Sequence, residues 1–242
     1  MKSKIIKQLV NNEISLTQAL THLQTLAHDL NNKDLESWAK KEKVGYSTSD
    51  KLPKYRQTES FYFTYSGFNG RYEVKNAPLP VGFLSEETLN KIGKLEFPQS
   101  VRALEEYLIG ESQNVTIDRS IYAIEVVERS NDGITPLTLG QILPKSFFYN
   151  ALEQIKNKTL ESLLRLEDEF GVLDDLNIDV SNRPRAYVEQ FNKDMNTTIN
   201  IITPATQKES AHNKIFWHIL IPIVTATLAG LGTYFLTKYL GG

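Results

Sequence analysis

The sequence predicts an α+β fold: a helix-rich cytoplasmic body with short β-hairpins, followed by one C-terminal transmembrane helix. Apolar residues recur at helical spacing in several segments, most clearly from Lys145 to Phe170. Two glycine-containing turns are flanked by aromatic and β-branched residues, which favour strands. The run from Ile215 to Thr237 contains no formally charged residue. We therefore expect an α+β body over residues 1–171, a helix and polar tether over 172–213, and a transmembrane anchor over 214–239.

Three helices are expected at the start of the chain. The first is a short amphipathic helix around Ile5. Ser15 and Gln18 have the spacing of a capping box, in which each side chain bonds a backbone N–H of the other residue, so a second helix begins there. A third helix contains Trp38 and ends near Gly45.

The next segment predicts a β-hairpin. Phe61–Tyr65 and Arg71–Val74 favour strands, and Asn69-Gly70 between them favours a tight turn. Ser85 and Ser100 then stand where they can cap two further helices.

A second hairpin and a long helix are expected after residue 120. Ile121–Val127 is rich in β-branched residues and predicts a strand, which would return after Asp132-Gly133 through Ile134–Leu139. The helix from Lys145 to Phe170 would end at Gly171.

A shorter helix around Tyr187 and Phe191 precedes the anchor, and the sequence from Asn192 to Asn213 is polar, which is typical of a tether. As a helix, Ile215–Thr237 would be about 34 Å long, enough for a hydrocarbon core of about 30 Å. The alternative, a buried core helix, fits less well because core helices rarely run this long without a polar face. We expect a single-pass, tail-anchored protein of the cell inner membrane, with its N-terminal body cytoplasmic.

Two small residues lie one helical turn apart within the expected anchor. Ala226 and Gly230 would share a face, and small residues at this spacing allow two helices to pack closely in a membrane. This pattern predicts helix pairing, although glycine and alanine are common in such helices without pairing.

Composition excludes several kinds of site. The 242 residues contain no cysteine, which rules out disulfides, thiol nucleophiles and cysteine-ligated metal centres. The formal net charge is −2, with both signs well mixed, so no nucleic-acid partner is expected.

No residue set indicates a reaction. His28-Asp29 is the dipeptide that holds metals in HD-type phosphohydrolases, but His22 lies on a different face of the same helix. Gly67–Gly70 lacks the lysine and following helix of a phosphate-binding loop. We expect no catalytic residue, no metal and no cofactor.

One group of residues is a candidate ligand or partner site: Trp38, Tyr46, Tyr55 and Arg56, near the proline-ordered loop at Pro53. An arginine beside aromatic rings can bind a ligand through stacking and bidentate hydrogen bonds. The alternative, which we favour, is a packing corner in which the aromatic rings cover the first helices.

Two blocks of the sequence together resemble the AbiTii domain of bacterial abortive-infection proteins, over residues 1–170. The first block comprises Ile14-Ser15-Leu16, Ala19-Leu20, Leu26-Ala27, Leu35, Trp38, Gly45-Tyr46 and Leu52–Arg56. The second comprises Leu143–Ser146, Ala151–Ile155 and Leu166-Glu167. It departs from the family at Lys156-Asn157-Lys158, where an arginine often stands. The resemblance implies phage defence by growth arrest or death of the infected cell, and it carries no catalytic residue to this chain.

These observations favour a membrane-anchored antiphage effector that acts by assembly and membrane perturbation. Its expected partners are the lipid bilayer, further copies of itself, and a signal ligand or partner defence protein. One alternative is an anchored nuclease or nucleotide hydrolase with an unrecognised active site. Another is an adaptor or sensor that recruits a separate effector.

Overall fold

The computed structural model describes residues 2–129 and 133–198. These residues belong to one compact unit that spans 1–202. The expected anchor over 214–239, with Ala226 and Gly230, lies outside the described residues. Within the described ranges, no helix is both long and apolar enough to cross a membrane.

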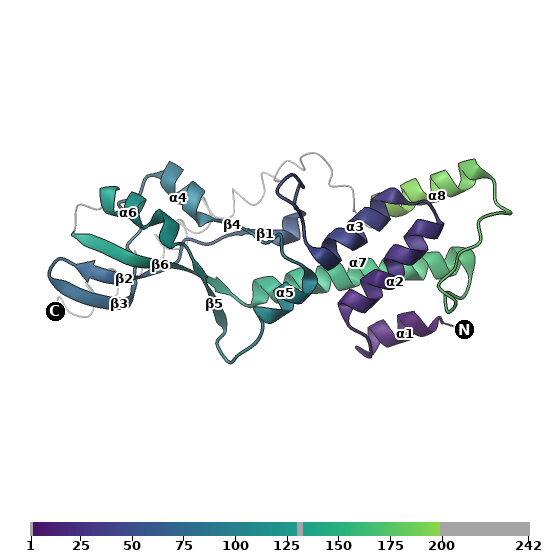
Figure 1. The fold of residues 1–242 in the computed structure, drawn as a ribbon, viewed down its shortest axis with the longest axis horizontal. Helices are drawn as coiled ribbons and strands as arrows, with labels where there is room; N and C mark the ends of the chain where they lie inside the picture. Colours follow the sequence, from purple (N-terminus) through teal and green to yellow (C-terminus); the bar gives the residue numbers. More distant parts are fainter. Residues whose placement is uncertain (1, 130–132, 199–242) are drawn as a thin grey trace, which may run out of the picture. The chain divides into compact units, whose positions relative to one another are not determined.

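The body has the expected α+β fold with short antiparallel sheets (Figure 1). Its helices are α1 (Lys4–Val10), α2 (Leu16–Asp29), α3 (Lys33–Val44), η1 (Lys54–Arg56), α4 (Glu86–Gly93), α5 (Val101–Glu106), η2 (Ser120–Tyr122), α6 (Ala123–Arg129), α7 (Ser146–Phe170) and α8 (Arg185–Thr198). Its strands are β1 (Gln57–Glu59), β2 (Phe63–Asn69), β3 (Tyr72–Pro78), β4 (Lys94–Glu96), β5 (Asn114–Asp118) and β6 (Ile134–Pro144).

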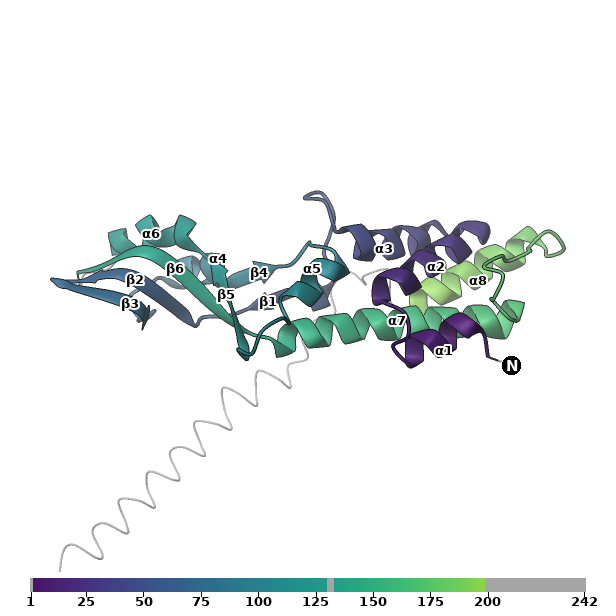
Figure 2. The ribbon, with the colours of Figure 1, turned by 60° about the horizontal axis from the view of Figure 1, so that its bottom comes forward.

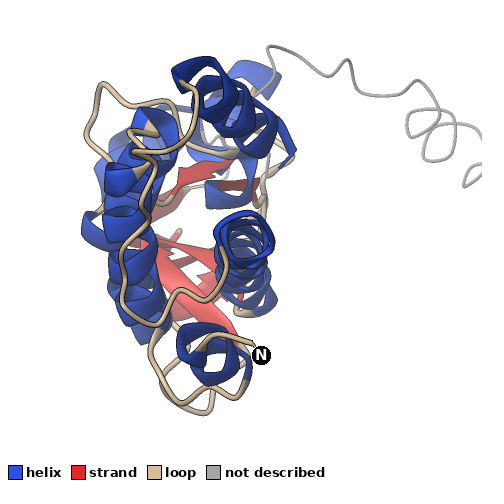
Figure 3. Cartoon of the chain, turned by 90° about the vertical axis from the view of Figure 1, so that its right-hand side faces the viewer, coloured by secondary structure: helices blue, strands red, loops and turns tan. Residues whose placement is uncertain are grey.

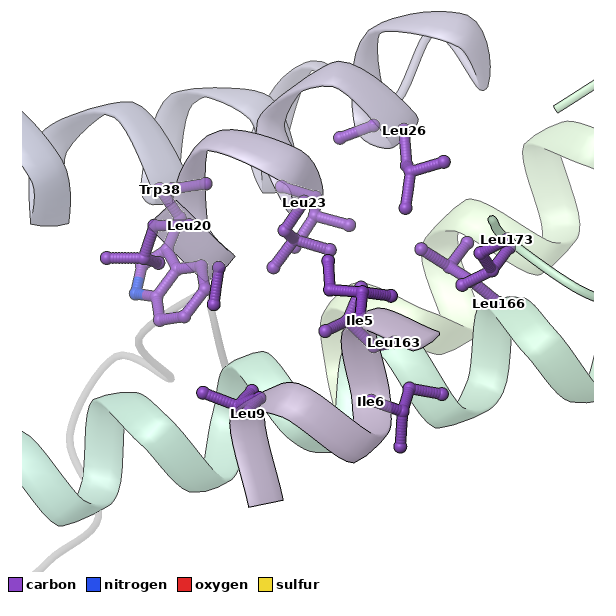
Figure 4. Packing of buried hydrophobic residues seen from close by; sticks show 14 of the residues in the cluster. Ile5, Ile6, Leu9, Leu20, Leu23, Leu26, Trp38, Leu163, Leu166 and Leu173 are labelled. Atoms are coloured by element: carbon purple, nitrogen blue, oxygen red, sulfur yellow. The ribbon is translucent and has the colours of Figure 1, made fainter. Parts of the chain in front are cut away.

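Helices α1, α2, α3, α7 and α8 share one apolar core. Figure 4 shows leucines of α2 facing those of α7, with isoleucines of α1 between them. Figure 3 views this helical part end on, with the strands behind it. The capping box that begins α2 is confirmed: Gln18 N donates to Ser15 Oγ at 3.2 Å, and Ser15 N donates to Gln18 Oε1 at 2.9 Å.

The strands form a four-stranded antiparallel sheet of order β3-β2-β6-β5 and a separate pair, β1-β4. The predicted hairpin at Asn69-Gly70 is confirmed as β2-β3. Helices α4 and α6 cover one face of the sheet (Figure 2), where Phe63, Tyr65 and Leu139 meet Ile92 and Val126. Leu79 and Leu84, from the segment between β3 and α4, complete this second apolar cluster.

The prediction of a strand at Ile121–Val127 is wrong, because this segment forms η2 and the start of α6. Strand β6 is present, but β2 pairs with one of its edges and β5 with the other. Neither edge of β6 is therefore free to pair with residues 121–127. The edge opposite β2 pairs instead with β5, a strand that we did not predict.

The segment instead follows helical spacing. Ala123 and Val126, three residues apart, are both buried, and Val126 belongs to the apolar cluster of the sheet. Ile121 and Ile124 stay 86% and 73% exposed. β-Branched composition favoured a strand, but the inward positions repeat at a helical interval.

The predicted long helix is confirmed as α7, which follows directly from β6. Just before it, the buried Lys145 Nζ donates to the carbonyls of Leu108, Ile109 and Gly110 at 3.0, 3.0 and 2.7 Å. These bonds hold residues 108–110, which follow α5, against the junction between β6 and α7. Gly171, with φ of +86°, ends α7 as expected.

The expected helix around Tyr187 and Phe191 is confirmed as α8. This helix continues to Thr198, so the first part of the tether expected from Asn192 is helical. Met195 and Asn196 are buried, which explains why a polar stretch folds there: one of its faces packs on the body. The rest of the expected tether lies outside the described residues.

Candidate functional site

The fold brings Trp38, Tyr46, Tyr55 and Arg56 together around Glu42, a residue that the sequence analysis missed. Glu42 lies one helical turn after Trp38 on α3, so both side chains point the same way. The sequence held one signal for Glu42. It is an acidic residue on the same helix face as Trp38, although Lys41 and Lys43 stand on either side of it.

Local backbone geometry explains how this group assembles. Gly45, at the end of α3, has φ of +101°, and a Cβ there would lie 3.0 Å from the Pro98 carbonyl oxygen. A glycine is therefore needed for the chain to turn and let Tyr46 N donate to the same carbonyl at 2.7 Å. Pro53 precedes η1, which carries Tyr55 and Arg56 back toward α3.

Two tyrosines converge on one carboxylate oxygen. The hydroxyls of Tyr46 and Tyr55 each donate to Glu42 Oε1 at 2.6 Å, and Trp38 Nε1 donates to the Tyr55 hydroxyl at 3.0 Å. Burial, and then the negative charge of Glu42, raise the pKa of both tyrosines well above the usual value. Both tyrosines therefore stay protonated and act as hydrogen-bond donors.

Arg56 occupies the other oxygen of the same carboxylate. Its Nε donates to Glu42 Oε2 at 3.1 Å, and its terminal nitrogens bond Glu42 Oε2 and the carbonyls of Phe97 and Gln99. Both side chains of the ion pair are 0% exposed. The guanidinium carbon also lies 5.2 Å from the centre of the Tyr46 ring. Arg56 thus joins α3 to the segment that leads into α5.

Helix α7 reaches the same cluster through Lys158. Its ammonium lies 5.9 Å from the centre of the Tyr55 ring. Burial lowers the pKa of Lys158, against the opposing charges of Glu161 and Glu42. Two residues earlier on α7, Lys156 Nζ donates to Asn12 Oδ1 at 2.6 Å. Lys158 and Lys156 therefore connect α7 to two separate places in the first part of the chain, Tyr55 and Asn12.

This cluster (Trp38, Glu42, Tyr46, Tyr55 and Arg56, hereafter the Glu42 cluster) makes its polar contacts with other parts of the body. The guanidinium and the carboxylate satisfy each other and nearby carbonyls, as buried charges must. Tyr46 and Tyr55 remain partly exposed at its edge. Such an arrangement can hold α3, η1 and the start of α5 in one register. A ligand role for Trp38, Tyr46, Tyr55 and Arg56 stays a prediction.

The two residues of the His28-Asp29 dipeptide make separate contacts. His28 Nδ1 lies 3.4 Å from Glu36 Oε1, while Asp29 Oδ2 accepts from Ile178 N at 3.3 Å. Among the described residues, no group of three or more His, Cys, Asp or Glu side chains could hold a metal ion.

Comparison with known protein families gave a match. The sequence model of the AbiTii family matches residues 2–211, so the match includes α8 as well as both sequence blocks. No curated protein and no solved structure matches the chain.

Proposed function

Because the chain belongs to the AbiTii family of abortive-infection, phage-defence proteins, we propose that it is a membrane-anchored defence effector that assembles and perturbs the bilayer. The observation that carries this proposal is the uncharged run from Ile215 to Thr237, which follows a folded body in the sequence. An apolar run of this length is suited to the bilayer. A defence protein placed there can kill the infected cell by making its membrane leak.

The contacts of α8 fix the last described helix, which precedes the expected anchor in the sequence, on the body. Asn196 and Asn32 exchange two amide hydrogen bonds of 3.0 Å, and Asn196 Nδ2 also donates to Asp34 Oδ2 at 3.2 Å. Asn192 Nδ2 donates to the Leu30 carbonyl at 3.0 Å, and Met195 is fully buried between these asparagines. The last described turn of α8 is therefore held on α2 and α3.

The other end of α8 is also fastened. Arg183 contacts Glu169 of α7 and lies 4.9 Å from the centre of the Phe170 ring, and Phe170 packs edge-on against Phe191 at 5.3 Å. Tyr187 donates its hydroxyl to the same Glu169 at 2.5 Å. Contacts at both ends therefore hold α8 on the helical part of the body.

In this proposal the anchors of neighbouring copies pair through Ala226 and Gly230. Helix association in lipid depends on close packing, because apolar burial offers no gain between lipid and helix. The small-residue face provides that close approach.

The experiment compares the full chain with a chain that ends at Asn213 during phage challenge, using a membrane-potential dye. We expect the full chain to fractionate with membranes, to depolarise infected cells and to protect the culture. The shorter chain should remain in the high-salt supernatant and do neither. Protection by the shorter chain would contradict the proposal and would favour a reaction carried out by the body.

A further inference from the structure

A cleft on the helical part of the body has the features of a small-molecule site. It measures about 240 Å³ and lies between the α1–α2 turn, α5 and α7. Figures 1 and 2 both place α1 and α5 against α7. The residues that line it are Leu9, Asn12, Ile14, Ser15, Leu16, Glu105, Leu152, Glu153 and Lys156.

Four of the residues that line this cleft are apolar, and the others are polar or charged. Leu9 and Leu16 belong to the buried core, and Ile14 and Leu152 are packed against it while remaining partly exposed. Ligand pockets typically combine such walls with a few convergent polar groups. The volume falls just below the range of about 300–1,000 Å³ typical of drug-sized ligands, so the ligand must be small.

The polar groups select the charge of the ligand. Glu105 on α5 and Glu153 on α7 both line the cleft, both are solvent-exposed, and neither forms an ion pair within the described part of the chain. Lys156 also lines the cleft, but its ammonium donates to Asn12 Oδ1 at 2.6 Å. Burial raises the pKa of Glu105, with Arg102 acting in the opposite direction. A cation near Glu105 would stabilise its ionised carboxylate and so offset the desolvation that raises this pKa.

We propose that the cleft binds a small molecule with an apolar body and one ammonium group. The apolar body lies between Ile14 and Leu152, and the ammonium lies between the carboxylates of Glu105 and Glu153. An anion is disfavoured, because two carboxylates outweigh the one lysine. A hard metal ion is also a poor fit, since it takes six or more oxygen ligands. Such a ligand would connect the first helices, α5 and α7, and these elements also support the Glu42 cluster.

Binding is tested on the full chain in detergent micelles, with empty micelles as the blank. Three probes share one carbon skeleton: isoamylamine, isoamyl alcohol and isovalerate. Saturation-transfer NMR and calorimetry should show isoamylamine binding about tenfold more tightly than the alcohol, with no binding of isovalerate. Equal binding of the amine and the alcohol, or preferential binding of isovalerate, would overturn the proposal.

Variants locate the site. The double substitution Glu105→Gln and Glu153→Gln should weaken isoamylamine binding about tenfold and leave alcohol binding unchanged. Glu106→Gln is the matched control, because it removes the same charge from α5 at a residue that does not line the cleft. Circular dichroism confirms that each variant is folded. An equal loss with Glu106→Gln would show a non-specific charge effect and would refute the site.

We further propose that ligand binding at this cleft triggers defence. This trigger role rests on the proposed function, whereas the binding itself does not depend on it. We expect isoamylamine alone to depolarise cells that express the full chain, and not cells that express the double variant. Binding without depolarisation would refute the trigger role, while the proposal of a ligand site would stand. A full chain that fails to depolarise infected cells would refute the proposed function, and the NMR result would still decide the site.

Discussion

Asn32 and Asn196 form a reciprocal amide pair in which each side chain donates to the other at 3.0 Å. They lie 164 positions apart in the sequence and are 2% and 4% exposed. Asn32 Oδ1 also accepts from Leu35 N at 3.1 Å and so caps α3. One buried pair therefore fixes both the start of α3 and the end of α8.

The amide pair should contribute measurably to stability. Asn196→Ala leaves the Asn32 amide buried without its partner, which costs about 1–3 kcal/mol of unfolding free energy. Urea unfolding of the full chain in detergent measures this loss. The exposed Thr197→Ala is the control and should stay within about 0.5 kcal/mol of the parent. A double variant with Asn32→Ala that shows simple additivity would contradict coupling between the two residues.

The Glu42–Arg56 ion pair should be the most sensitive part of the Glu42 cluster. Glu42→Gln leaves a buried guanidinium without its counter-charge, and breaking such a pair costs about 3–5 kcal/mol. Thermal unfolding should show a large drop for this variant. Glu36→Gln is the matched control on α3, because its side chain is partly exposed. Equal melting temperatures for the two variants would show that the buried pair contributes no more to stability than the partly exposed Glu36.

Trp38 separates the packing and binding interpretations of the cluster. Trp38→Ala removes a buried indole and should cost about 3–5 kcal/mol, so protection is lost through unfolding. Trp38→Phe keeps most of the packing and loses the hydrogen bond to Tyr55, so it should cost about 1 kcal/mol and retain protection. Melting and phage-protection assays check both variants. A Trp38→Phe protein with near-parental melting and no protection would make Trp38 a binding residue.

The N-terminal segment should make stability depend on pH in the acid range. Glu167 accepts from Ser3 N at 2.5 Å and pairs with Lys2 at 2.8 Å. Burial would raise its pKa, but the bonds from Lys2 and Ser3 outweigh burial and lower the pKa from 4.5 to about 2. The folded state therefore holds the ionised form, and its stabilisation is full above about pH 4.5 and declines as the pH falls toward 2.

Denaturant unfolding between pH 6 and pH 2 measures this dependence. Glu167→Gln should be less stable at neutral pH and lose part of the acid-range slope. Asp168→Asn, at the exposed neighbouring position, should leave most of that slope. A slope unchanged by Glu167→Gln would show that other carboxylates cause it.

The anchor should depend on its small-residue face. Gly230→Ile keeps the run apolar, so membrane insertion should survive, but the branched side chain prevents close helix approach. We expect loss of protection and of depolarisation, with unchanged fractionation. Leu231→Ile, on another face, is the control. If Gly230→Ile or a poly-leucine replacement protects normally, the anchor is a passive tether.

Features set by neighbouring residues could be predicted from the sequence. The capping box at Ser15 and Gln18, the turn at Asn69-Gly70 and the end of α7 at Gly171 depend on local hydrogen bonds and on φ preference. Each of them forms where its residues predicted it. The same reasoning grouped Trp38, Tyr46, Tyr55 and Arg56, because they follow one another closely in the chain.

Other features were decided only by the tertiary structure. Ile121–Val127 has the composition of a strand, but both edges of β6 are occupied, so its few inward residues pack as a helix on the sheet. Glu42 became the centre of the cluster because Arg56 is buried and needs a counter-charge that only folding brings near. Asn196 reads as part of a polar tether until Asn32, distant in sequence, offers a complementary amide. In each case the stabilising contact is made by tertiary packing, which local sequence patterns do not encode, whether the partner lies 14 positions away, as Arg56 does from Glu42, or 164, as Asn32 does from Asn196.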